Sequence, residues 1–169
     1  MTFAALTGTL KISEGISGFA NSAIWLIVGA FLFSRGFIKT GLGKRIAYNL
    51  ISAFGSSSLR LAYALALSDL ILAPATPSNT ARVGGVIMPI TTSLAKAFGS
   101  EPQDGPRKIG SFLMQSIYQV NTITSAMFQT SMAGNTLVAA LALQSFGIGI
   151  TWGDWAMATI VPGIIALII

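Results

Sequence analysis

The residues best suited to chemistry lie in one short stretch, residues 73–85, where helix breakers and small polar side chains interrupt an apolar region. Two prolines end the helix before it, because proline has no backbone N–H to donate. Ser78 or Asn79 can then cap a new helix that begins near Thr80. A non-helical turn at membrane depth persists only where protein surrounds it or where it lines a water-filled cavity. The stretch therefore predicts a place where a polar ligand binds.

Carboxylate binding is the chemistry that these side chains suit. The start of a helix carries partial positive charge and free N–H groups, which bind anions. The side chains of Asn79 and Thr80 can add donors of their own. Arg82 is costly at membrane depth and must face a cavity or a partner. We keep two interpretations of Arg82: an electropositive attractant for the ligand, and an ion pair with Asp69.

A second polar cluster, Asn121, Thr124 and Ser125, lies in a long apolar segment. These side chains could line a cation or ligand site at a second helix break. They could equally bond back to their own helix or to a neighbour, as Ser and Thr often do in membrane helices. Both interpretations stay open at the level of sequence.

The composition restricts the class of protein. The chain has 169 residues, of which 53% are hydrophobic and 9% charged, and a mean hydropathy of +0.73. A soluble domain carries about a quarter charged residues, so we expect an all-α integral membrane protein. With no cysteine and no histidine, we expect no disulfide, no metal site and no cofactor apart from a possible Na⁺. The net charge of +5 does not indicate nucleic acid, because the basic residues fall at predicted membrane edges.

The pattern predicts three main elements before the second polar cluster. A transmembrane helix at 22–40 has tryptophan near one end and basic residues at the other, which orients it from outside to inside. A helix at 44–54 lies in the inner membrane interface. The stretch 59–98 forms a re-entrant hairpin, since each arm is too short to cross and both outer ends are basic. Two complete spans joined by an outside turn are the alternative.

The rest of the chain predicts a second discontinuous helix. Residues 109–146 are too long for one crossing and contain no loop, so we expect one helix interrupted near 121–125. Residues 147–154 form an outside loop, and a last helix at 156–169 turns back inward. Because that segment ends inside an apolar run, we expect the chain to be a piece of a longer membrane protein or a truncated gene product.

The run Pro74-Ala-Thr-Pro-Ser-Asn-Thr-Ala-Arg-Val-Gly-Gly85, together with 30–43 and 127–135, resembles the divalent anion/Na⁺ symporter family. Within that family it is most similar to the bacterial citrate, tartrate, succinate and 2-oxoglutarate/malate exchangers and their plastid relatives. The resemblance covers nearly the whole chain. It implies an inverted-repeat transporter whose substrate lies between two Ser-Asn-Thr tips, of which this chain holds the first.

By resemblance, Ser78, Asn79 and Thr80 would bind a substrate carboxylate, and Ser78 and Asn79 would help to form a cation site in Na⁺-coupled members. The family implies a scaffold part, here 1–57, a transport part, here 58–169, and a homodimer in the bacterial inner membrane. Two departures weaken a sodium site: Thr124-Ser125 replaces a glycine-rich break, and Pro74 replaces a hydroxyl side chain.

The sequence thus predicts a secondary transporter of di- or tricarboxylates, working by anion exchange, with Arg82 among the substrate-binding residues. Na⁺-coupled symport and a non-transporting truncated module are the alternatives, and a passive anion channel is a further class. An intramembrane enzyme is the weakest hypothesis, because no nucleophile–base pair occurs in the sequence. Substrate and lipid are the expected partners.

Overall fold

The computed structural model describes residues 6–9, 11–103 and 108–169, and every regular element in this part of the chain is helical. The predicted polar loop at 99–108 therefore lies partly outside the described residues. The elements are α2 (Ile12–Gly15), η1 (Ser17–Ala20), α3 (Ser22–Thr40), α4 (Leu42–Phe54), α5 (Ser58–Leu72), η2 (Ala73–Ala75), α6 (Asn79–Arg82), the π-helical η3 (Val83–Ile87), α7 (Met88–Ala97), α8 (Ile109–Met127), α9 (Ala133–Phe146) and α10 (Trp152–Ile168).

The predicted helix at 22–40 is α3, and the predicted helix at 44–54 is α4. Gly41 separates them in the left-handed conformation, with φ of 70°, which glycine adopts without a Cβ clash. The stretch Ile24–Thr40 meets Leu42–Phe54 at an angle of 59°. The sharp bend after α3 is thus a glycine turn, and the placement of α4 in the membrane interface stays a prediction.

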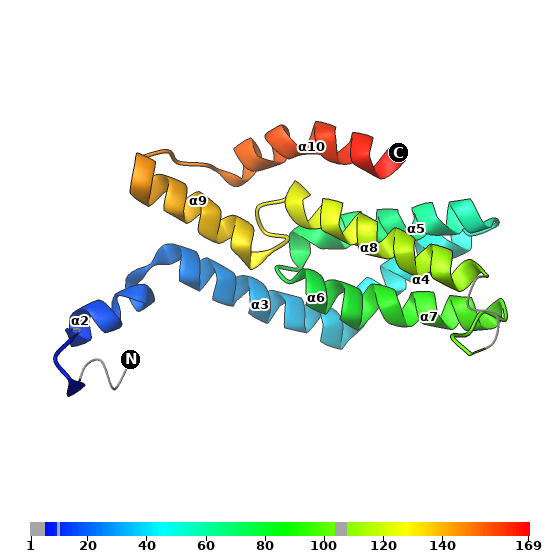
Figure 1. Cartoon of the computed structure of the whole chain (residues 1–169), viewed down its shortest axis with the longest axis horizontal. Coiled ribbons are helices and arrows are strands. Elements are labelled where there is room, and N and C mark those ends of the chain that lie inside the picture. Colours follow the sequence, from blue (N-terminus) through cyan, green and yellow to red (C-terminus); the bar gives the residue numbers. More distant parts are fainter. Residues whose placement is uncertain (1–5, 10, 104–107) are drawn as a thin grey trace.

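The chain reverses direction between α5 and α7, as the hairpin prediction requires. In Figure 1 both arms have their outer ends on the same side and meet at the break between them. The second arm is one helical run, α6–η3–α7, in which the π-helical turn follows directly after Arg82. Helix α8 packs against both α5 and α7. The reversal agrees both with a re-entrant hairpin and with two complete spans, so the re-entrant arrangement stays a prediction.

The second break lies later than predicted. Helix α8 continues unbroken through residues 121–125 to Met127, and the chain leaves the helix at Phe128, whose φ and ψ are −126° and 141°. The hydroxyl of Thr122 bonds back to the carbonyl of Tyr118 at 3.0 Å. Polar side chains in a helix can be satisfied in this way without ending it. The interruption therefore occupies residues 128–132, between α8 and α9.

Helix α10 begins at Trp152, four residues before the predicted start at 156. A capping box causes the earlier start: the Thr151 hydroxyl accepts from the Asp154 N–H at 3.2 Å, and the Asp154 carboxylate accepts from the Thr151 N–H at 3.0 Å. Such a reciprocal cap satisfies two donors at a helix N-terminus. Helix α10 then packs along α8.

An apolar core fills the space among α4, α5, η3, α7 and α8. Its fully or almost fully buried members are Ala47, Leu61, Leu65, Leu72, Val86, Ile87, Ile90, Leu113 and Ile117. Gly43 lets α4 approach η3, since a Cβ there would lie 3.3 Å from a methyl of Val86. Within a bilayer such packing stabilises by close contact rather than by removing surface from water.

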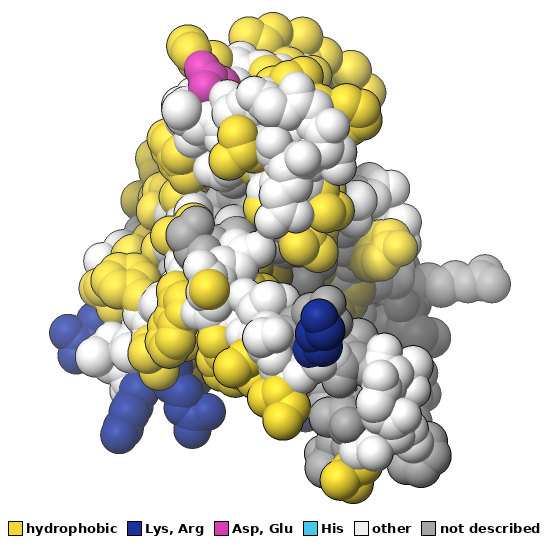
Figure 2. All heavy atoms as spheres, turned by 90° about the vertical axis from the view of Figure 1, so that its left-hand side faces the viewer, with side chains coloured by type: hydrophobic (Ala, Val, Ile, Leu, Met, Phe, Trp, Pro, Cys, Tyr) yellow, Lys and Arg dark blue, Asp and Glu magenta, His cyan; other side chains and the backbone are white. Residues whose placement is uncertain are grey.

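One described helical stretch, Ser58–Ala75, is long and apolar enough to cross a membrane, and 39% of it is buried in the protein. The first arm of the hairpin is thus longer than predicted, because the helical stretch begins at Ser58 and includes η2, and its length does not exclude a complete span. A second candidate arises if the bent pair Ile24–Thr40 and Leu42–Phe54 counts as one span. Helix α10 is apolar but shorter. In the view of Figure 2, most visible Lys and Arg side chains lie on the lower side of the molecule, away from the acidic side chains at the top.

Candidate functional site

The tip of the hairpin presents Ser78, Asn79 and Thr80 at the start of α6. The Ser78 hydroxyl caps the helix by accepting from the Ala81 N–H at 3.2 Å. The Asn79 side-chain oxygen accepts from the Thr80 N–H at 2.8 Å. These two bonds consume helix-start donors that an anion could otherwise use. The exposed Thr80 hydroxyl donates to the same Asn79 oxygen at 3.4 Å. The donor left for a ligand is the Asn79 amide nitrogen, which has no hydrogen bond within the described residues.

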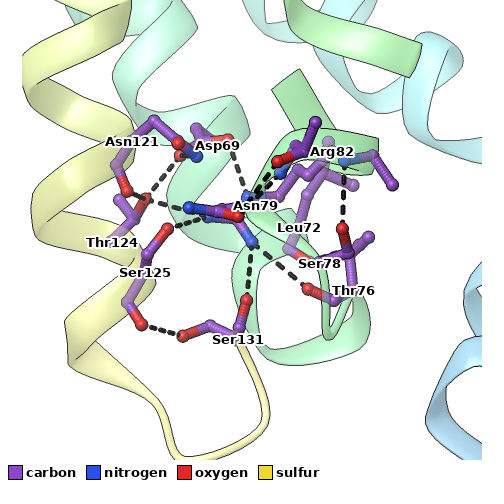
Figure 3. A network of polar contacts seen from close by, with 12 residues as sticks. Asp69, Leu72, Thr76, Ser78, Asn79, Arg82, Asn121, Thr124, Ser125 and Ser131 are labelled. Carbon is purple, nitrogen blue, oxygen red and sulfur yellow. Dashed lines mark hydrogen bonds and ion pairs between the residues drawn. The ribbon is translucent and has the colours of Figure 1, made fainter. Parts of the chain in front are cut away.

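Arg82 lies one turn beyond the tip and points inward (Figure 3). Its side chain has no exposed surface, and the guanidinium makes five hydrogen bonds, which equals its number of donors. Nε donates to Asp69 Oδ1 at 2.8 Å. The acceptors of the other bonds, at 3.1–3.3 Å, are the carbonyls of Thr76 and Ser131 and the hydroxyls of Thr124 and Ser125.

The ion-pair interpretation of Arg82 is thereby confirmed. Asp69 is 2% exposed and, besides Arg82, accepts from the Thr124 hydroxyl and from the Asn121 amide. A ligand that bound Arg82 directly would have to displace one of its five protein acceptors. The geometry thus makes Arg82 a bridge between parts of the protein, with its charge balanced by Asp69.

The three residues of the second predicted cluster meet at this bridge. Thr124 and Ser125 are buried and bond Arg82, and Asn121 is half-buried beside Asp69. They come from the continuous part of α8 and not from the break itself. The structure therefore separates the predicted site residues into an outward tip, residues 78–80, and an inner network around Arg82 and Asp69.

The second break is held by side chains that the sequence did not single out. The Ser131 hydroxyl donates toward the carbonyl of Ser125 at 2.6 Å, and the Asn135 amide donates to Ser125 and Phe128 at 2.7 and 3.0 Å. The Thr136 hydroxyl donates to the Gln129 carbonyl at 3.1 Å. Helix ends leave carbonyls without partners. A cluster of short polar residues just after a long helix was the available signal.

The two breaks are also tied to each other directly. The Ala133 N–H donates to the Pro77 carbonyl at 3.0 Å, and the Thr130 hydroxyl donates to the Pro74 carbonyl at 2.8 Å. The Trp152 indole N–H donates to Thr130 in turn, at 3.1 Å. The backbone groups of two segments that are far apart in the sequence thus find hydrogen-bond partners in each other.

No group of three or more His, Cys, Asp or Glu side chains that could hold a metal ion occurs in the described part of the chain. The available ligand chemistry is instead that of amide and hydroxyl donors beside a half-helix start, which suits a carboxylate.

Two interrupted helical segments whose breaks meet, with polar groups concentrated at the meeting point, are an arrangement typical of secondary transporters. The chain belongs to the family described as "Sodium:sulfate symporter transmembrane region", whose model matches residues 1–169.

Three relatives illustrate the similarity. The chain is 58% identical over 166 residues to the "Putative malate transporter YflS" of Bacillus subtilis, covering 98% of this chain and 35% of that protein. It is 50% identical over 165 residues to "Dicarboxylate transporter 1, chloroplastic" of Spinacia oleracea, covering 97% and 29%. It is 43% identical over 160 residues to an "L-tartrate/succinate antiporter" of Escherichia coli, covering 94% and 33%. The chain spans about a third of the length of these relatives, all of which are named for transport.

Proposed function

We propose that the complete protein is a secondary transporter of di- or tricarboxylates that works by anion exchange. The names of the relatives support the substrate class, and one of them is called an antiporter. The observation that carries the proposal is the tip, where the Asn79 amide nitrogen bonds no described residue while Ser78 caps the helix behind it. The exposed Thr80 hydroxyl has only a long bond of 3.4 Å, to Asn79, which a carboxylate could replace. Amide and hydroxyl donors at a helix start pair well with a carboxylate.

The inner network favours exchange over sodium coupling. A sodium site at the second cluster would need the oxygens of Thr124 and Ser125, but both accept from the Arg82 guanidinium. A sodium ion would have to displace the Arg82 N–H groups from both hydroxyl oxygens. Because Asp69 balances the charge of Arg82, we do not assign Arg82 to direct substrate contact. Its role is to connect the two breaks and to keep sodium from Thr124 and Ser125.

The setting that we propose follows from the family and from the charge pattern. The hairpin 59–98 enters the membrane from the side on which its basic ends lie, and its tip reaches mid-membrane. Residues 1–57 belong to a scaffold part and residues 58–169 to a transport part, in a multi-pass homodimer of the bacterial inner membrane. A second Ser-Asn-Thr tip, outside this chain, would complete the site.

Proteoliposomes that contain the full-length protein test the transport mode. We expect uptake of labelled dicarboxylate only when the vesicles are preloaded with a dicarboxylate. Uptake into empty vesicles driven by a Na⁺ gradient would refute exchange and favour symport. Large electrical currents without a counter-substrate would instead indicate a channel.

The variant Asn79→Ala tests the tip. We expect a loss of at least tenfold in exchange rate, because the Asn79 amide nitrogen bonds no protein group within the described residues. The free energy of unfolding should fall by no more than about 1 kcal/mol, since the variant also removes the oxygen that accepts from Thr80. Asn49→Ala is the matched control, since Asn49 is an exposed asparagine on α4 and should exchange at the wild-type rate. Wild-type exchange by Asn79→Ala would rule out the proposed carboxylate contact.

A further inference from the structure

A groove between α3 and the hairpin tip combines an apolar wall with two cations at one end. It encloses about 700 Å³, and Ala81 of α6 forms part of its far side. The α3 wall is a ladder with the spacing i, i+3, i+4, i+7 and i+11. Its rungs are Val28, Phe31, Leu32, Arg35 and Lys39. At 3.6 residues per turn these positions share one face of a helix.

The two basic rungs have no acidic partner. Both side chains are exposed, and neither forms an ion pair within the described residues. Two unpaired cations one turn apart attract anions, and their long stems lie along apolar surface while their heads reach toward the interface. The charged end of the groove therefore suits a phosphate rather than another basic surface.

The apolar residues of α3 indicate which kind of phosphate ligand fits the groove. Leu32 is 70% exposed and Phe31 45% exposed, so the ladder offers an acyl chain a surface that a small hydrophilic anion cannot use. Seven residues of helix separate Val28 from Arg35, the first cation, which is about 10 Å of wall at 1.5 Å per residue. The hydrocarbon part of one leaflet is about 15 Å, half of the roughly 30 Å core. The length of the wall therefore suits the part of an acyl chain nearest the head group.

We propose that this groove binds one anionic glycerophospholipid, with the phosphate on Arg35 and Lys39 and an acyl chain along the apolar rungs. Basic pockets between membrane helices on the positively charged side recognise such head groups. Since Ala81 closes the far side, the bound lipid bridges α3 and the segment that carries Asn79. The site is independent of which carboxylate the protein transports and of whether transport is by exchange.

The test uses the full-length protein in neutral detergent and phosphatidylglycerol as the probe, with binding measured by native mass spectrometry. We expect the double variant R35Q/K39Q to bind about 30-fold more weakly than wild type, because each basic residue near an anionic head group contributes several-fold to affinity. R35K/K39R should bind within threefold of wild type. K44Q/R45Q removes two exposed cations of α4 that do not line the groove and should also stay within threefold.

The apolar wall is tested separately. Leu32→Ser should weaken phosphatidylglycerol binding, whereas Leu26→Ser, at a 51% exposed leucine outside the groove, should not. Four results would overturn the proposal: binding by R35Q/K39Q within threefold of wild type, an equal loss in K44Q/R45Q, competition by free glycerol phosphate at the same concentration as lipid, and displacement of the lipid by dicarboxylate. The last result would assign the cations to substrate.

Discussion

Removal of either member of the Arg82–Asp69 pair should destabilise the protein far more than removal of an exposed charge. Loss of Arg82 leaves a 2% exposed carboxylate without its cation and takes a donor from the carbonyls of Thr76 and Ser131. Breaking a buried pair by removing one partner costs about 3–5 kcal/mol. We therefore expect Arg82→Met and Asp69→Leu each to lower the free energy of unfolding by about that amount.

The double variant shows whether the two side chains stabilise the protein as an ion pair or independently of each other. Once both charges are gone, no unpaired charge stays buried, so Arg82→Met with Asp69→Leu should cost about 2–3 kcal/mol less than the sum of the single variants, the upper part of the range for residues in contact. Unfolding titrations in mixed micelles, followed by tryptophan fluorescence, measure these values. Arg60→Met is the control, because Arg60 is exposed and makes one side-chain bond, to Ser56 at 2.9 Å.

Two outcomes would refute this reasoning. A coupling energy below about 0.5 kcal/mol would mean that the pair contributes no more than distant, independent residues do. An Arg82→Met variant that unfolds like wild type but no longer exchanges dicarboxylate would show that Arg82 acts on the substrate and not on the connection between the two breaks.

Two further substitutions probe the packing around the second break, and both are checked by the same unfolding titrations. Gly163→Ala should lower the free energy of unfolding by about 1–3 kcal/mol, because its Cβ would lie 2.6 Å from Met127 Cγ. Gly153→Ala should be neutral, because the nearest contact of its Cβ would be at 3.8 Å. Equal midpoints for the two variants would show that α10 shifts freely on α8. Asn135→Leu removes the amide that serves two carbonyls of the break and should cost about 1–3 kcal/mol, and a stability equal to wild type would mean that other donors replace it.

The tip and the inner network have different roles, and physical requirements explain why. A carboxylate site must stay accessible, so its donors cannot be consumed by the protein, and Asn79 keeps its amide nitrogen free of bonds within the described residues. The turn that presents this donor must nevertheless be rigid, because irregular backbone in a membrane needs internal partners. Arg82 provides that rigidity by reaching the carbonyl of Thr76 in one break and that of Ser131 in the other.

Local rules explain why much of the fold was predictable. Helix α3 has the predicted bounds, and the reversal near Pro74 and Pro77 follows from the missing backbone donors of proline. The cap at Ser78 needs only the side chain and the next turn of backbone. Each of these features depends on residues within a few positions of one another, and such information is present in the sequence.

The sequence by itself therefore determined that a polar tip with Asn79 interrupts an apolar helical chain. Only the tertiary structure decided what Arg82 does and where the second break lies. The acceptors of Arg82 come from α5, from α8 and from the two breaks themselves. Its role therefore depends on how segments that are distant in the sequence pack together. The break at 128–132 contains no proline or glycine. It exists because Ser131, Asn135 and Thr136 satisfy the carbonyls that leave the helix.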